Sequence, residues 1–513
     1  MNGLRAGLIG TAAIMAVVLP SAALADKGTL RVASQSDIRS TNPGVDRSGF
    51  TDSVHLNIVE GLVGYKDDLS VGPVLAEAVS VSDDQKVYTF TLRPGVKFHN
   101  GETLTAAHVK ESWDRYMDEA TKWRCRSRFN GEDGVNVVSV ETPDERTVIY
   151  TIDRPSPLFL KDMARFDCGS TGIVHRDSVK PDGSWDRPIG TGPFVFVEWQ
   201  PGQKIVLDRF ADYVPAEGPM DGFTGRKTVS VDRVVINVVP DAASAKAAMR
   251  AGEVDLLNIS TSDVEEMREA GFNVVIQPTP AWGSFLISRH DEFMANRTLR
   301  QAMAAALDVQ ELAALMGYDS HNASPIPPMS IYYTETQKKT YGFDPERARA
   351  LLAEAGYNGE PIKLVTSRRS PTIFNQAVVA QSMWQAVGLN IEIEVLDWGA
   401  QLDLYRSGEY QIQSFGFSAR LDPALSWDMF SGEQTRKVWD DPEALEKIRL
   451  LMNETDSEKR AVLSDSLHEM FLDQVPAIGL YSQPQTTALS ERVSGFKTWP
   501  GGRTRFWNIA LDG

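Results

Sequence analysis

Apolar and polar residues alternate most clearly between residues 87 and 99. Tyr88, Phe90 and Leu92 alternate with Thr89 and Thr91, the pattern of a strand with one buried face. After a turn at 93–95 the alternation continues over 96–99, which predicts a β-hairpin. Thr105 is placed to cap a following helix that has one apolar face. On that face lie Val109, Trp113, Tyr116 and Met117.

Short apolar runs farther along the chain alternate with helical patterns. Residues 234–239 form a near-continuous apolar strand, followed by an alanine-rich helix at 241–250 and another strand at 273–277. The second half of the chain has the same order of elements. Its predicted elements are strands at 362–366, 389–395 and 412–417 and a helix at 374–387. This order is typical of an α/β protein with parallel strands.

The first 25 residues have the pattern of a secretory signal peptide. Arg5 precedes an apolar run over 6–19, and Ala23-Leu24-Ala25 offers a small-residue cleavage site. The run of roughly 14 residues is shorter than the ~20 that cross a membrane, which disfavours the alternative of a membrane anchor. No cysteine follows the cleavage site, so a lipid anchor is not expected either. We therefore expect an exported, periplasmic protein.

Length, charge and cysteine content limit the classes of function. The mature part of the 513-residue chain is too long for one hydrophobic core and is expected to form two or three lobes. The net charge of −17 argues against nucleic acid or an anionic membrane as a partner. In an oxidising compartment Cys125 and Cys168 suggest one disulfide, with two unrelated buried thiols as the alternative. The seven histidines are scattered, so no metal site, cofactor or catalytic triad is predicted.

The order of residues around the first strand is more specific than its pattern. The run YTFTLRPGVKFHNGETLTAAHVKESW at 88–113 resembles the signature of the extracellular solute-binding proteins of family 5, the peptide/opine/nickel class that serves ABC importers. Two further segments, PIGTGPF at 188–194 and GEVD at 252–255, resemble the same family. His108 stands where the family usually has an acidic residue. The resemblance covers essentially the whole mature chain.

The resemblance implies a two-lobed α/β fold of the periplasmic binding protein type, with an extra β-rich subdomain inserted in the first lobe. We expect the first lobe at 26–58, 194–279 and 483–513, the inserted subdomain at 59–193 and the second lobe at 280–482. Such a protein closes on a small solute and delivers it to the membrane subunits of an ABC permease. We expect a monomer that carries out no covalent chemistry.

Candidate ligand-binding residues follow from the geometry of α/β sheets, in which ligands bind beyond the carboxyl ends of the strands. The loops that leave those ends are 367–370, 397–398 and 418–422, and the loop 280–284 should border the same cleft. The candidate residues on these loops are Trp282, Ser284, Arg368, Trp398, Phe417, Ser418, Arg420 and Asp422. A solvated loop is the alternative for Arg368, and a core position is the alternative for Trp398. Trp113 and Trp384 lie on apolar helix faces and are expected in the core.

Arg420 sets the predicted class of ligand. Peptide-binding members of the family hold the ligand's amino group with an acidic side chain after the strand that matches 412–417, and Arg420 lies near that place. The following Asp422 fits a family D-P pair that is more often structural. Because a guanidinium matches a carboxylate or phosphate, we predict a carboxylate-bearing solute such as an opine-like conjugate or a modified peptide.

Three other functions remain as alternatives. Ordinary di- or oligopeptides are the next choice of ligand. A secreted hydrolase would need a nucleophile elbow, and residues 169–172 lack the G-x-S-x-G spacing. A periplasmic folding helper or a purely sensory receptor on the same scaffold is the third.

Overall fold

The computed structural model describes residues 28–46, 48–318, 321–369, 371–418 and 420–512. The predicted signal peptide at 1–25 lies outside the described residues. Within the described ranges, no helix combines the length and the apolar character that crossing a bilayer requires.

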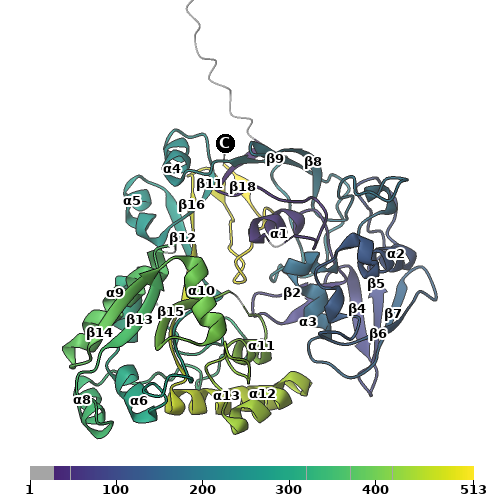
Figure 1. Cartoon of the computed structure of the whole chain (residues 1–513). Helices are drawn as coiled ribbons and strands as arrows, with labels where there is room; N and C mark the ends of the chain where they lie inside the picture. Colours follow the sequence, from purple (N-terminus) through teal and green to yellow (C-terminus); the bar gives the residue numbers. More distant parts are fainter. Residues whose placement is uncertain (1–27, 47, 319–320, 370, 419, 513) are drawn as a thin grey trace, which may run out of the picture.

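The central element is a mixed sheet of ten strands (Figure 1). Its strands are β1 (Thr29–Ser34), β8 (Phe194–Gln200), β9 (Lys204–Arg209), β10 (Arg233–Val238), β11 (Leu256–Ile259), β12 (Asn273–Ile287), β13 (Ile362–Ser367), β14 (Ile391–Leu396), β15 (Ile412–Phe417) and β16 (Ala477–Leu489). They lie in the order β14-β13-β15-β12-β16-β11-β1-β10-β9-β8. β1 runs parallel to β10 and β11, and β13 runs parallel to β14 and β15. The predicted α/β class is confirmed, with parallel strand pairs in both halves of the sheet, while β9 and β8 extend one edge by antiparallel pairing.

Two long antiparallel strands, β12 and β16, join the two ends of this sheet. Residues 273–278 of β12 pair with β16, and this part of β16 pairs with β11 on its other side. Residues 282–286 of β12 lie between β16 and β15. The pairing shifts register between Pro278 and Trp282, where proline lacks the N–H that a ladder needs. The sequence pattern predicted that a strand ends at 277 and that a loop follows at 280–284. That prediction is wrong, because the strand continues through the irregularity.

Helices cover the faces of the sheet, and their ends follow capping chemistry. They are α4 (Ala242–Arg250), α5 (Val264–Glu269), α6 (Arg297–Ala305), α7 (Val309–Leu315), α8 (Pro345–Glu354), α9 (Pro371–Ala386), α10 (Trp398–Ser407), α11 (Pro423–Asp428), α12 (Pro442–Asn453) and α13 (Ser457–Gln474), with the short 3-10 helix η5 (Thr261–Asp263). Asp344 accepts from the backbone N–H of Arg347 at the start of α8, and Pro345 occupies the first position of that helix. Trp384 of α9 is fully buried against Phe285, as expected for a core residue.

A second sheet of four antiparallel strands follows the order β4-β5-β7-β6. The strands are β4 (Ala76–Val81), β5 (Val87–Leu92), β6 (Val137–Glu141) and β7 (Thr147–Ile152). β5 is the predicted strand, but it pairs with β4 and β7 and not with residues 96–99. The predicted hairpin is therefore wrong. Val96 and Phe98 are apolar because both side chains are buried. The backbone of Lys97, between them, forms an isolated β-bridge with Thr103, and its side chain pairs with Asp212.

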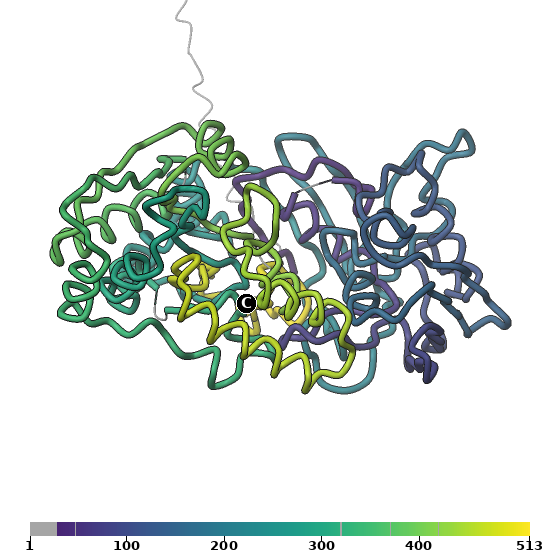
Figure 2. Tube along the Cα trace, turned by 60° about the horizontal axis from the view of Figure 1, so that its bottom comes forward, coloured from purple at the N-terminus to yellow at the C-terminus, as the bar shows by residue number. Residues whose placement is uncertain are grey.

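Most of the remaining elements surround this second sheet or connect it to the first, whereas β17 (Val493–Ser494) and β18 (Ala510–Leu511) pair with each other and pack on the core of the first sheet. The others are α1 (Gly49–His55), β2 (Val63–Tyr65), β3 (Val71–Pro73), α2 (Ala106–Met117), η1 (Glu119–Thr121), η2 (Arg126–Arg128), α3 (Phe159–Ala164), η3 (Phe166–Thr171) and η4 (Arg176–Ser178). Figure 2 shows the blue segment that holds the four-stranded sheet at one end of the molecule and the green segment with β13 to β15 at the other.

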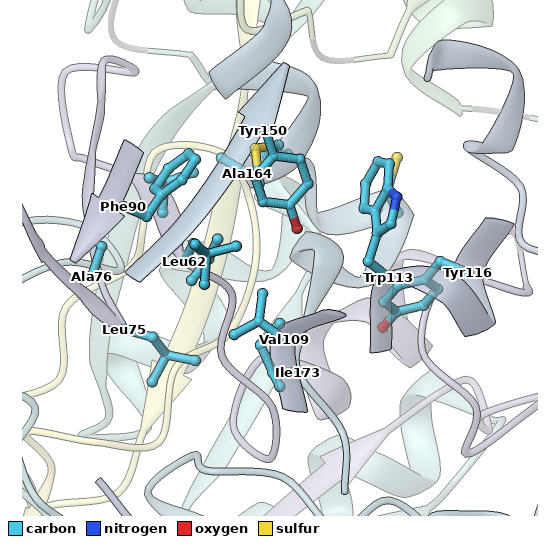
Figure 3. Close-up of a cluster of buried hydrophobic side chains, with 14 of the residues drawn as sticks. Leu62, Leu75, Ala76, Phe90, Val109, Trp113, Tyr116, Tyr150, Ala164 and Ile173 are labelled. Carbon is cyan, nitrogen blue, oxygen red and sulfur yellow. The ribbon is translucent and has the colours of Figure 1, made fainter. Parts of the chain in front are cut away.

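An aromatic core fixes α2 and the four-stranded sheet to each other (Figure 3). Trp113 lies edge-on to Tyr150 with ring centroids 5.1 Å apart, which confirms Trp113 as a core residue. Thr105 caps α2 as predicted, and His108 completes a capping box by accepting from the Thr105 backbone N–H. Next to this core, Cys125 and Cys168 form the predicted disulfide, with Cα atoms 5.6 Å apart.

Candidate functional site

A cavity of about 930 Å³ lies between two groups of residues that are distant in sequence. Its floor includes Thr279 and Ala281 on β12 and Gln485 on β16, the two long strands that join the two ends of the sheet. We call the two sides the first wall and the second wall. The lining residues of the first wall are Gly49, Asp52, Tyr65, Arg124, Arg128, Leu158, Lys161, Asp162, Arg165, Phe166, Asp167, Gly501, Gly502 and Arg503; those of the second wall are Tyr405, Phe415, Gly416, Phe417, Ser418, Arg420, Leu421, Leu425, Asp428, Met429, Arg436 and Lys437.

Arginines on the first wall are held in place by aspartates. Arg165 donates to Asp167 through Nε (3.0 Å) and Nη2 (2.7 Å), a bidentate geometry that fixes the guanidinium plane. Arg503 reaches Asp52 at 3.3 Å and lies over the ring of Phe166, 4.0 Å from its centroid. The first wall thus presents preoriented guanidinium groups to the cavity.

Two carboxyl groups of the first wall titrate near neutral pH. Burial raises the pKa of Asp52 to about 7, although the charge of Arg503 opposes the shift. Burial also raises the pKa of Asp162 to about 6, against the opposing charge of Arg165. Both groups therefore carry less than a full negative charge at mildly acidic pH.

The second wall is formed by the end of β15 and the chain that follows it. Arg420 donates through Nη1 to the carbonyl oxygen and to Oγ of Ser418, at 3.2 and 3.0 Å. Burial lowers the pKa of the Arg420 guanidinium, and the positive charge of Arg165 on the first wall lowers it further. Lys437 lies 3.6 Å from Asp428. The second wall is therefore basic as well.

Three of the predicted site residues come together on this cavity, and three others are buried elsewhere. Phe417, Ser418 and Arg420 all line the second wall. Trp282 is 1% exposed, and its indole N–H donates to the carbonyl of Asn322, so its ring is part of the core behind the wall. Ser284 is fully buried in β12.

Asp422 is the third buried candidate and has a structural environment. Its carboxylate caps α11 by accepting from the Ala424 N–H and accepts from Arg460 Nη2 at 2.6 and 2.7 Å. It also pairs with Lys161 of the first wall. With these partners the carboxylate is positioned to hold α11 and the two walls together.

The remaining two candidates lie beside the cavity. Trp398 lines an adjacent pocket of about 320 Å³, together with Arg369. This pocket shares Ala281, Gly416, Phe417 and Ser418 with the larger cavity. The guanidinium of Arg368 lies over the ring of Phe374, 4.4 Å from its centroid, and does not line either space.

The first wall was not predicted from the sequence. Asp52, Arg165 and Arg503 come from three distant segments, and no local pattern connects them. One signal was available: Arg124 precedes Cys125 and Asp167 precedes Cys168, so the disulfide places these neighbours together. The Arg124 Nη1 indeed donates to the carbonyl of Asp167 at 3.0 Å.

A cluster of Glu102, His108 and His175 has the residue types of a metal site, which the scattered histidines did not lead us to expect. The Nδ1 atom of His108 accepts from the Thr105 N–H, and that of His175 accepts from the Asp177 N–H. Each ring must then carry its proton on Nε2, and these atoms donate to the Glu102 carboxylate at 3.2 and 2.9 Å. The Nε2 protons of both rings donate to Glu102, and the lone pairs of both Nδ1 atoms already accept hydrogen bonds. This arrangement leaves no nitrogen of either ring open to a metal ion.

A cavity with two walls from distant segments, floored by the strands that join them, is the geometry of a protein that encloses a small solute. The description "Bacterial extracellular solute-binding proteins, family 5 Middle" matches residues 70–437. The chain belongs to this family of solute-binding proteins of ABC importers, whose members are periplasmic.

Individual relatives agree with this assignment along nearly their whole length. The chain is 28% identical to Heme-binding protein A of Haemophilus influenzae over 92% of this chain and 89% of that protein. It is 27% identical to the dipeptide-binding protein of Escherichia coli over 97% of each chain. The solved structure of HbpA2 from Haemophilus parasuis superposes with a TM-score of 0.80 at 24% identity, over 94% of this chain and 100% of that one.

Proposed function

We propose that the protein captures a carboxylate-bearing solute, such as an opine-like conjugate or a modified peptide, and delivers it to the membrane subunits of an ABC permease. The observation that carries this proposal is the position of Arg420, which lines the cavity at the end of β15. A guanidinium at this place offers a planar pair of donors to a carboxylate. The signal-peptide pattern at 1–25 supports capture in the periplasm.

Closure of the walls is the physical step of the proposed function. β12 and β16 are the strands that cross the sheet, and the register of β12 shifts between Pro278 and Trp282. We propose hinge bending there, with lobes at 26–58, 194–279 and 483–513 on one side and 280–482 on the other, and with 59–193 as a subdomain of the first. A solute that contacts both walls stabilises the closed state by the contacts it makes only in that state.

An ordinary di- or oligopeptide is the second candidate ligand. The names of relatives such as the dipeptide-binding protein of Escherichia coli favour it. A peptide would place its carboxylate at Arg420 and its ammonium at one of the aspartates. The two candidates differ in whether an ammonium group is required.

The test is to identify the solute that co-purifies with the native protein by mass spectrometry and to measure its binding by calorimetry. The substitution Arg420→Ala should weaken binding more than tenfold, because removing one partner of a desolvated charge pair costs ~2 to 5 kcal/mol. Arg449→Ala is the matched control, since Arg449 is an exposed residue of α12 that pairs with Glu446. Unchanged affinity of the Arg420→Ala protein, or recovery of a chemically altered solute, would contradict the proposal.

A further inference from the structure

The cavity is basic although the protein is acidic. Among the described side chains that line it, eight are basic and four are acidic, whereas the whole chain has a net charge of −17. The basic ones are Arg124, Arg128, Lys161, Arg165, Arg420, Arg436, Lys437 and Arg503. A concave surface with an excess of one sign of charge focuses the potential and attracts ligands of the opposite sign.

Every acidic group on the cavity already has a basic partner. Asp167 accepts two hydrogen bonds from Arg165, and Asp162 lies 3.7 Å from the same guanidinium. The pairing of Asp52 with Arg503 and of Asp428 with Lys437 is described above. The ammonium group of a zwitterionic peptide would have to displace one of these bases, which costs binding energy. The raised pKa values of Asp52 and Asp162 lower the negative charge of the cavity further.

Arg165 and Arg420 place like charges on opposite walls. Both line the cavity, and the charge of Arg165 disfavours the charged form of Arg420. The carboxylate of Asp167, which holds Arg165, offsets part of this repulsion. The remainder opposes the approach of the walls when nothing lies between them. An anionic group between the two guanidinium groups converts the repulsion into two attractions, and it does so only in the closed state.

We propose that the solute carries at least two anionic oxo groups, carboxylate or phosphate, and that one of them bridges Arg165 and Arg420 across the cavity. The second group reaches Arg436, whose hydrogen bonds go to the neutral oxygens Oε1 of Gln434 (2.9 Å) and Oη of Tyr405 (3.3 Å). This inference rests on the proposed function, because it concerns the same captured solute. It adds a second anion and assigns Arg165 as a specificity-determining residue.

The test compares four probes built on one dipeptide skeleton. They are alanyl-alanine, which is zwitterionic; N-acetyl-alanyl-alanine, with one carboxylate; N-acetyl-alanyl-aspartate, with two carboxylates; and N-acetyl-alanyl-O-phosphoserine, which carries a phosphate on the same side chain and is compared at pH 5.5, where the phosphate has about one charge. Calorimetry uses the full mature chain, freed of bound solute by unfolding and refolding with its disulfide intact. We expect the doubly anionic probes to bind at least tenfold more tightly than the singly anionic one, a difference of about 1.4 kcal/mol. The tighter of the two identifies carboxylate or phosphate as the natural group.

Variants locate the bridge. Arg165→Met should reduce the preference for the doubly anionic probes to less than threefold, whereas the surface control Arg449→Met should keep it. Because Arg165 also holds Asp167, the double variant Arg165→Met/Asp167→Asn checks that the loss does not come from an unpaired carboxylate. It should behave as the single variant does.

The outcomes separate this inference from the proposed function. Equal binding of singly and doubly anionic probes, tighter binding of the zwitterion, or an unchanged preference in both Arg165 variants overturns the dianion inference alone. Failure of all four probes to bind contradicts the proposed function and this inference together.

Discussion

Lys161 on α3 and Asp422 at the start of α11 form an ion pair that joins the first wall of the cavity to the second. The Asp422 side chain is 1% exposed, and Arg460 of α13, behind the second wall, binds the same carboxylate. Burial alone would raise the pKa of Asp422, but the charges of Lys161 and Arg460 keep it below its usual value. The carboxylate thus stays charged and available to both partners.

Loss of this pair should open the cavity. In Lys161→Met the carboxylate keeps Arg460, so the fold survives, but the ionic contact between the walls is gone. We expect a shift toward open conformations by a factor of ten or more, about 1.4 kcal/mol, seen as a larger radius of gyration of the unliganded protein in small-angle scattering. Lys110→Met is the control, because Lys110 pairs with Asp114 on the exposed side of α2. Superimposable curves for wild type and Lys161→Met would contradict the prediction.

A second buried pair, Glu60 with Lys227, should govern stability. Lys227 Nζ lies 2.6 Å from Glu60, and Tyr213 donates to the same carboxylate at 2.9 Å. Lys227→Met leaves a buried carboxylate without its counter-charge, so we expect a loss of ~3 to 5 kcal/mol in the free energy of unfolding. Urea denaturation measures it. The double variant Glu60→Gln/Lys227→Met should recover part of the loss.

The control for that measurement is an exposed ion pair. Arg449→Met removes the partner of Glu446 on the surface of α12 and should cost less than ~1 kcal/mol. If Lys227→Met lowers the free energy of unfolding by no more than this control does, the prediction that the buried pair stabilises the fold is contradicted.

Lys227 also illustrates what the sequence could predict. The segment GFTGRKT at 222–228 has the glycines and the lysine of a phosphate-binding loop, but Arg226 separates Gly225 from Lys227, which breaks the spacing of that motif. In the structure Lys227 is buried and paired with Glu60. Strands and helices in strongly periodic segments were predicted well, as β15 at Ile412–Phe417 shows. Their positions depend on local patterns of burial, which the sequence carries directly.

The candidate site was predicted only on one side. Geometry pointed to the carboxyl end of β15, and Phe417, Ser418 and Arg420 do line the cavity. Trp282 and Ser284 were misplaced because β12 is central in the sheet and covered on both faces, so alternation cannot separate an inner from an outer side. The first wall was missed because Arg165 and Arg503 are brought together by the return of the chain's C-terminal segment, a long-range contact without a local pattern.

Removal of the disulfide should weaken both the fold and the site. Cys125 and Cys168 are 43 residues apart, and closing such a loop stabilises by about 4 kcal/mol from chain entropy. The neighbouring Arg124 and Asp167 line the first wall, so Cys125→Ser/Cys168→Ser should also lower solute affinity. Denaturation and calorimetry measure the two effects. A reductant should bring the wild type to the stability of the double variant and leave that variant unchanged; equal stability of oxidised wild type and double variant would contradict the prediction.

Buried histidines should make the protein sensitive to acid. Burial lowers the pKa of His55, His99 and His468 to about 4, below the ~6.5 of an unfolded chain. Between these values the unfolded state binds more protons than the folded state at these three sites, so their contribution to stability is complete above pH 6.5 and falls as the pH drops toward 4. Asp52 and Asp162, whose pKa values are raised, contribute in the opposite direction. Each histidine contributes up to ~1.4 kcal/mol per pH unit in that window.

His99 is the best position to test this dependence. Its Nδ1 accepts from the Gly190 N–H at 3.3 Å and its Nε2 donates to the Gly192 carbonyl at 3.0 Å, which requires a neutral ring. His99→Gln keeps a donor and an acceptor but cannot take up a proton. Urea denaturation at pH 4.5 to 7.5 should therefore show a slope of stability against pH that is smaller by about one proton. Replacement of the exposed His290 by glutamine serves as the control. If His99→Gln keeps the wild-type slope, His99 binds the same number of protons in the folded and the unfolded state, which would contradict the prediction.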